Sequence, residues 1–300
     1  MRAADRHTAR HAHCRGAALT NRRTVLQAAA ALAALAACAR AGAQSALAAA
    51  PLAIGDTFML PSSVLGENRR INVYNAPAAN GAPLPVLYMP DGGLEEDFLH
   101  IAGLLQISVA SGTMRPFMLV GIENTQRRRD LTGPSDDPED RKIAPVIGRS
   151  EAFRAFIRTE LMPAISGRYR TTGETAIVGE SLAGLFVMET YFVAPEMFDT
   201  YIAVDPSLWW NREGLLAKGA AQLRTRRHGN KTLFVAASGE PGMPALAGRL
   251  KQVFDTAAAP GLRFELAAFP EENHRTVYHP AALRAFRTAF RKPAEQRGPG

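Results

Sequence analysis

The sequence predicts an α/β protein in which helices flank both faces of a mostly parallel central sheet. From about residue 68 onward, short apolar runs alternate with longer helix-like segments, which is typical of parallel strands joined by crossover helices. The composition agrees, because 300 residues with 47% hydrophobic and 21% charged residues describe a globular protein rather than a disordered or fibrous one.

The elements can be placed along the chain. The expected strands are Ile71–Tyr74, Pro85–Met89, Phe117–Ile122, Thr175–Val178, Tyr201–Val204, Leu233–Ala237 and Arg263–Ala267. The expected helices span residues 94–111, 150–162, 182–193, 213–226, 244–257 and 280–291. Ligands of such sheets bind beyond the carboxyl ends of the strands, so the residues just after each strand are the first candidates for a site.

One long polar insertion interrupts this pattern. Residues 124–149 contain QRRRD and SDDPED and connect two apolar segments. They form either a solvated surface loop or a lid that binds substrate. The acidic cluster lacks the alternating oxygen ligands and the glycine of a calcium loop, so no metal is expected there.

The first residues resemble an export signal. NRRTVLQ at Asn21–Gln27 precedes an alanine-rich apolar run, and its paired arginines indicate the twin-arginine (Tat) route. We expect residues 1–43 to be this signal peptide, residues 44–300 to form one catalytic domain, and the mature protein to reach the periplasm. Two processing sites compete, namely a lipoprotein box that would place a lipid anchor on Cys38 and an ordinary cleavage site at residues 41–43.

Net charge and cysteine content exclude some classes of protein. The chain carries a formal charge of +7, but residues 1–38 hold six arginines and one aspartate, so the remainder carries only +2. That argues against a nucleic-acid partner. Cys14 and Cys38 are the only cysteines, so the body after the signal would have no internal disulfide.

Two serines compete for the relaxed motif Gly-x-Ser-x-Gly. Ser181 lies in VGESLAG between a β-prone run and an apolar helix, which is the strand-to-helix context that the motif requires, although Ala183 replaces the second glycine. Ser150 lies in GRSEA and precedes an amphipathic segment, where it is typical of a helix N-cap. We therefore predict that Ser181 is a nucleophile.

A serine nucleophile needs a base to take its proton. His274 follows the last expected strand and precedes the last expected helix, where this class of fold delivers its base, and His279 is the alternative. His100 and His228 fit packed or solvated positions better.

The base in turn needs a carboxylate, and the chain order places it between the serine and the histidine. Glu240, just past the strand LFVAAS, fits best. Asp205 in YIAVDPS is the competitor from the preceding strand, and Asp255 is a mid-helix candidate.

An acyl-transfer site also needs backbone donors for an oxyanion. One is expected from the amide of Leu182, which follows the serine. The second is expected from the DGG turn after the strand PVLYMP, with Gly93 as the first choice and Gly92 as the next.

Six motifs in one order carry a family resemblance. LYMPDGG, VGIENTQRRRDLTGP, VGESLAGLF, VDPSLWW, SGE and ENHRTV resemble the putative-esterase family of α/β hydrolases, nearest to its ferric-enterobactin and bacillibactin esterases, over residues 55–291. The resemblance implies an α/β-hydrolase fold and a Ser181, His274 and Glu240 triad with Gly93 and Leu182 as oxyanion donors. It marks as substrate-binding candidates Arg127, Arg129, Asp130, Trp209 and Trp210.

The sequence thus predicts an exported serine esterase that works without a cofactor. Arginines and aromatic faces would suit an anionic catecholate siderophore, whose trilactone is the expected substrate. Two alternatives stay open: an esterase or acyltransferase acting on another acyl ester, and a non-catalytic siderophore-binding lipoprotein.

Overall fold

The computed structural model describes residues 23, 26–34, 49–76, 81–225, 228–257 and 259–292. Its contacts divide the chain into two units, Met1–Ala53 and Ile54–Gly300. In the first unit, residues 26–34 are helical and exposed. No helix in the described ranges is long and apolar enough to cross a membrane. Cys38 and residues 41–43, the two predicted processing sites, lie outside the described residues.

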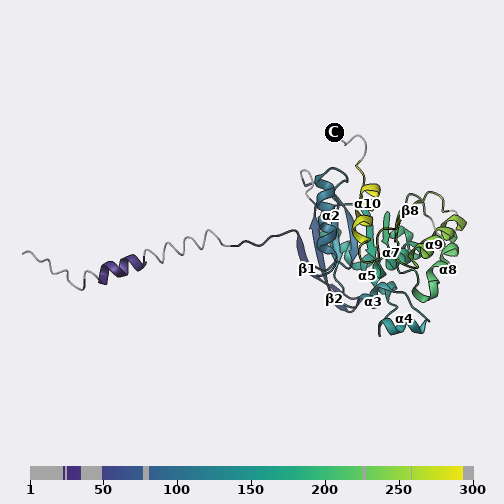
Figure 1. Ribbon diagram of the computed structural model, residues 1–300, viewed down its shortest axis with the longest axis horizontal. Helices are drawn as coiled ribbons and strands as arrows, with labels where there is room; N and C mark the ends of the chain where they lie inside the picture. Colours follow the sequence, from purple (N-terminus) through teal and green to yellow (C-terminus); the bar gives the residue numbers. More distant parts are fainter. Residues whose placement is uncertain are drawn as a thin grey trace, which may run out of the picture. The chain divides into compact units, whose positions relative to one another are not determined.

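The second unit is built on one sheet of eight strands (Figure 1). They are β1 (Asp56–Ser62), β2 (Glu67–Asn75), β3 (Leu84–Pro90), β4 (Met118–Ile122), β5 (Thr171–Glu180), β6 (Thr200–Val204), β7 (Thr232–Ser238) and β8 (Arg263–Phe269). Their order across the sheet is β1-β2-β4-β3-β5-β6-β7-β8. β2 pairs antiparallel with both β1 and β4, and the remaining pairs are parallel. The predicted mostly parallel sheet is confirmed.

Helices cover both faces of this sheet and enclose two cores. Their bounds are α2 (Phe98–Ala110), α3 (Arg127–Leu131), α4 (Pro138–Ile143), α5 (Ser150–Phe156), a π-helical turn (Ile157–Leu161), α6 (Met162–Arg168), α7 (Leu182–Val193), a 3-10 turn (Pro195–Met197), α8 (Trp210–Thr225), α9 (Met243–Ala257) and α10 (Tyr278–Ala289). One core contains residues of α5, α7, α8 and α9, and the other contains residues of α2 and α10, which lie side by side in Figure 1.

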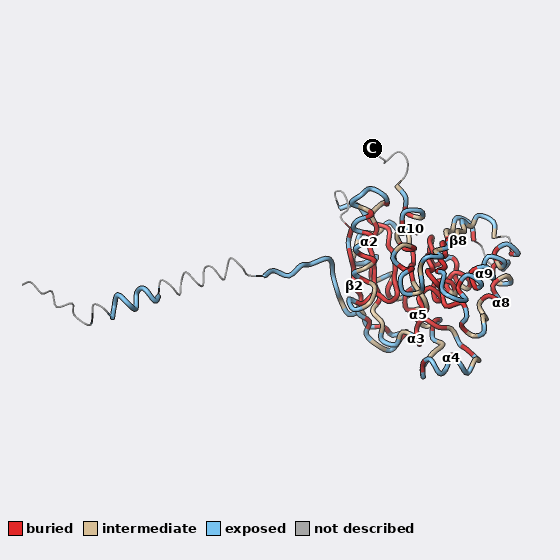
Figure 2. The backbone as a smooth tube through the Cα atoms, viewed as in Figure 1, coloured by how far each residue is buried: buried red, intermediate tan, exposed pale blue. Residues whose placement is uncertain are grey.

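The central strands are buried along most of their length, as the red segments of Figure 2 show. Successive side chains on a strand point to opposite faces, so Ile177 enters one core and its neighbour Val178 enters the other. A strand covered on both faces reads as a continuous apolar run, and this is why the sequence indicated these strands clearly.

The structure contains elements that the sequence prediction lacked, including β1 and the short helices α3, α4 and α6. β1 was not predicted, because it is an edge strand that is exposed along most of its length and contains Pro61. The insertion at residues 124–149 contains the short helices α3 and α4. Both helices are five or six residues long, which is too short for a helical period to show in the sequence.

A buried ion-pair network fastens this insertion to the sheet. The guanidinium of Arg69 on β2 contacts the carboxylate of Asp130 on α3, and both side chains are fully buried. Arg129 Nε donates to Asp130 Oδ1 at 2.6 Å, and its NH2 group donates to Glu67 Oε1 at 2.7 Å. The prediction of Arg129 and Asp130 as substrate-binding residues is therefore corrected, because the network takes up both charges inside the protein.

We expect Asp130→Ala to destabilise the protein strongly, because it leaves the buried Arg69 guanidinium without its carboxylate. The expected loss in free energy of unfolding is about 3–5 kcal/mol, measured by equilibrium denaturation in urea. The control is Asp255→Ala, which removes the exposed i,i+4 pair with Lys251 and should cost less than about 1 kcal/mol. Equal losses for the two variants would contradict the role given to this network.

Candidate active site

Ser181 occupies a sharp turn between β5 and α7. Its φ is 60° and its ψ is −119°, a conformation that non-glycine residues rarely adopt. The turn is held from both sides, since Ser181 N–H donates to Val204 O at 3.0 Å and Ser181 O accepts from Ser207 N–H at 3.0 Å. These bonds fix the serine at the carboxyl end of the sheet.

Close packing explains which residues of the motif must be small. A Cβ on Gly179 would lie 2.6 Å from the carbonyl carbon of Ala183, and a Cβ on Gly184 would lie 2.9 Å from Val204 O. Ala183 itself is fully buried and fits. The second glycine of the motif is thus displaced by one residue, to Gly184.

His274 links the serine to a buried carboxylate. Its Nε2 lies 3.0 Å from Ser181 Oγ, and its Nδ1 lies 3.0 Å from Asp205 Oδ2. Because Asp205 can only accept when ionised, we assign the proton of the neutral ring to Nδ1, which leaves Nε2 free to accept from the serine hydroxyl. The alternative base, His279, instead contacts His100 at 3.1 Å.

The carboxylate partner of His274 is Asp205 and not Glu240, which corrects the sequence prediction. Asp205 is fully buried at the end of β6, and it accepts from Ser238 N–H at 2.6 Å and from Ser238 Oγ–H at 2.7 Å. Glu240 is exposed, and its carboxylate reaches only the backbone N–H of His274, at 3.5 Å. It makes no contact with the imidazole that could orient the ring.

The electrostatics of Asp205 and His274 agree with this pairing. Burial opposes ionisation of Asp205, but the hydrogen bonds from His274 and Ser238 hold the pKa of Asp205 below its ordinary value. The hydrogen bond from His274 to Asp205 raises the pKa of His274 against the opposing effect of burial. The arrangement therefore stabilises the protonated form of the His274 ring.

The two predicted oxyanion donors differ in availability. Leu182 is the first residue of α7, so its N–H has no acceptor within the helix. Gly93 N–H donates to Glu96 Oε2 at 2.7 Å, and Gly92 N–H donates to Ile122 O at 3.0 Å. The acceptor of Gly92 is a backbone carbonyl at the end of β4, whereas the acceptor of Gly93 is the side chain of Glu96.

The other predicted binding residues have separate environments. Arg127 is partly exposed and donates to Asp91 through two bonds of 2.7 Å. Trp209 is 40% exposed, whereas Trp210 is 4% exposed and donates its indole N–H to Gly133 O at 3.1 Å. Arg127 and Trp209 thus remain accessible, while Trp210 is a packing residue.

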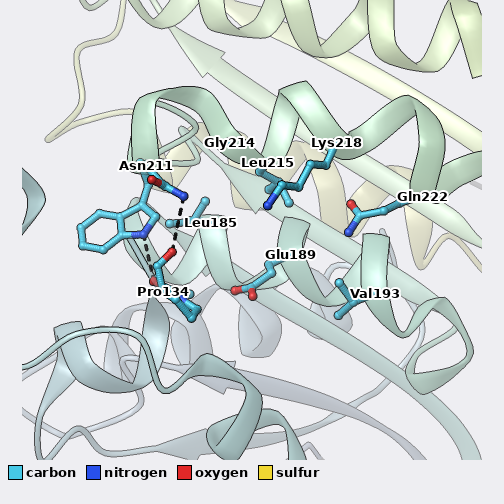
Figure 3. Close-up of a pocket in the computed structure, with 11 residues that line it drawn as sticks. Pro134, Leu185, Glu189, Val193, Asn211, Gly214, Leu215, Lys218 and Gln222 are labelled. Atoms are coloured by element: carbon cyan, nitrogen blue, oxygen red, sulfur yellow. Dashed lines mark hydrogen bonds between the residues drawn. The ribbon is translucent and has the colours of Figure 1, made fainter. Parts of the chain in front are cut away.

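Trp210 also lines a cavity of ≈ 170 Å³ between α7 and α8. Figure 3 shows Leu185 and Glu189 on one wall of it and Lys218 and Gln222 on the opposite wall. Ser150, the serine of the second copy of the motif, is fully buried, and its hydroxyl donates to Glu189 Oε1 at 2.9 Å. It is not the N-cap that the sequence indicated, and it has no histidine partner among the described residues.

Sequence reasoning missed one carboxyl at the site, that of Glu180. It lies directly before the serine, and its Oε1 is 3.4 Å from His274 Nε2. Burial raises the pKa of Glu180 to about 7. The signal was visible as an acidic residue in the variable position of the motif. No group of histidine, cysteine or acidic side chains in the described part of the chain could hold a metal ion.

The sequence and the fold are similar to those of known esterases. The family model described as "Putative esterase" matches residues 62–278. The chain is 29% identical to the ferri-bacillibactin esterase BesA of Bacillus subtilis over 75% of this chain and 86% of that protein. It is 32% identical to the siderophore triacetylfusarinine C esterase of Aspergillus fumigatus over 48% of this chain and 51% of that protein. A solved IroE-like serine hydrolase from Shewanella oneidensis has a TM-score of 0.70 at 30% identity, covering 79% of this chain and 80% of that one.

We expect Asp205→Asn to lower the pKa of His274 by about 1–3 units, because it removes the negative charge that stabilises the imidazolium. The measurement is an NMR titration of the His274 ring protons. Glu240→Gln is the matched control and should shift the same pKa by less than about half a unit, since Glu240 does not contact the ring. A larger shift for Glu240→Gln than for Asp205→Asn would restore the original assignment of the acid.

Proposed function

The chain belongs to the putative esterase family of α/β hydrolases, and we propose that it is a serine esterase that forms an acyl-enzyme on Ser181. One observation carries the proposal: the ring of His274 contacts Ser181 Oγ through Nε2 and Asp205 Oδ2 through Nδ1, each at 3.0 Å. This is the arrangement in which a serine hydroxyl becomes a nucleophile near neutral pH.

The proposed reaction has two halves. Ser181 Oγ attacks the ester carbonyl carbon while its proton passes to His274 Nε2, and the resulting oxyanion is stabilised by the N–H of Leu182. His274 then gives that proton to the departing alkoxide, the carbon–oxygen bond breaks, and the acyl group remains on the serine. Water attacks in the second half with the same proton transfers, releasing the acid and the free enzyme.

We propose that the substrate is a siderophore ester, with the trilactone of a catecholate siderophore as the leading candidate. The support comes from the relatives, which are named as siderophore esterases from a bacterium and a fungus. Between β6 and α8, the exposed indole of Trp209 offers a face on which an aromatic ring can stack, and Arg127 offers a partly accessible cation.

We expect Ser181→Ala to abolish hydrolysis and Asp205→Asn to lower kcat about 10⁴-fold, while Glu240→Gln stays within about tenfold of wild type. Turnover is measured on ferri-bacillibactin, on iron-loaded triacetylfusarinine C and on a simple aryl ester, with thermal unfolding to check that each variant is folded. If the aryl ester is cleaved while both siderophores remain intact, the proposed substrate class is wrong. Siderophore binding without turnover of any ester would instead support a binding protein.

We also propose that the twin arginines direct export to the periplasm. The pair Arg22 and Arg23 and the apolar run that follows support this, and residues 26–34 of that run are helical. Mass analysis of the mature N-terminus should find either an acylated Cys38 or a chain that begins after residue 43. An intact N-terminus on protein from the cytoplasmic fraction would contradict export.

A further inference from the structure

Glu180 is a second oxygen neighbour of the catalytic imidazole. Its side chain is 16% exposed, and its Oε1 atom is buried without a hydrogen-bond partner among the described residues. This atom lies 3.4 Å from His274 Nε2, the same nitrogen that lies 3.0 Å from Ser181 Oγ. Two oxygens therefore compete for one ring nitrogen.

The two oxygens suit different protonation states of His274. Neutral His274 carries a lone pair at Nε2, which accepts from the Ser181 hydroxyl and has nothing to donate to a carboxylate. Protonated His274 carries N–H at the same position, which cannot accept from the serine but can donate to Glu180. An ionised Glu180 thus stabilises the form of the histidine that is unable to act as a base.

Glu180 lies among both acidic and basic groups that several elements contribute. Asp91 and Asp97, in the segment between β3 and α2, interact with it electrostatically, and so does Arg127 on α3. The same holds for His274, which precedes α10, and for Tyr278, the first residue of α10. Arg127 is already bonded twice to Asp91. Burial first, and then Asp97 and Asp91, raise the pKa of Glu180 to about 7, while His274 and Arg127 oppose the change. Glu180 therefore changes charge near neutral pH.

We propose that Glu180 is a positioning residue that holds protonated His274 away from its role as a base and so sets the lower pH limit of Ser181 reactivity. The inference rests on the proposed function only through the Ser181 and His274 pair, and not on the identity of the ester. It does not require Glu180 to touch the substrate.

The test measures how the rate of covalent labelling of Ser181 by a fluorophosphonate probe depends on pH. This probe reacts with the serine directly, so no natural substrate is needed. Glu180→Gln keeps the size of the side chain and removes its charge. We expect the midpoint of the acid limb to move to lower pH by about one unit, because His274 loses a nearby negative charge and binds its proton less tightly. The matched control is Asp97→Asn, since Asp97 faces the same cluster but is 39% exposed and lies 3.6 Å from His100 instead of contacting His274.

The expected result is a shift for Asp97→Asn less than half that for Glu180→Gln. Glu180→Asp keeps the negative charge but moves it farther from His274 Nε2, so its midpoint should lie between those of wild type and Glu180→Gln. It serves as the second variant if Glu180→Gln does not fold. Unchanged midpoints in both Glu180 variants, or an equal shift in Asp97→Asn, would overturn the inference. If wild type and Ser181→Ala label alike, the proposed function itself fails, and the two failures are therefore distinguishable.

Discussion

The close approach of α7 to the ends of β5 and β6 is the constraint on which the site depends. At Gly179 and Gly184 there is no space for a side chain between the helix and the two strands. This packing allows Ser181 to keep a positive φ, because the hydrogen bonds of its backbone to Val204 and Ser207 hold the turn in place. The strain at the serine is therefore compensated by contacts made elsewhere in the fold.

The register of the parallel strands determines which acid can reach the histidine. Glu180 is paired with Val204 across β5 and β6, so the next residue of each strand, Ser181 and Asp205, emerges at the same edge on adjacent strands. Glu240 follows β7, one strand farther from the serine. Ser238 ends β7 and directs both its N–H and its hydroxyl toward Asp205, which offsets the cost of burying that carboxylate.

The balance of charge around Ser181 differs from what the arginine-rich motif QRRRD indicated. Arg129 is bonded to Asp130 and Glu67, and Arg127 is bonded to Asp91. Arginines in a sequence reveal the number of cations but not their partners. Here most of that charge holds the insertion to the sheet, and the carboxyl of Glu180 stands beside the histidine instead.

The sequence by itself determined the parallel sheet, the strand-to-helix position of Ser181 and the placement of His274 after the last strand. These are local features, since buried strands give apolar runs and the serine turn needs small residues close to it in the chain. Only the tertiary structure decided that Asp205 and not Glu240 meets His274, that Arg129 is internal, and that Glu180 shares the ring nitrogen with Ser181. Those outcomes depend on strand register and on ion pairs between residues far apart in the chain, and neither leaves a mark in the local pattern of residues.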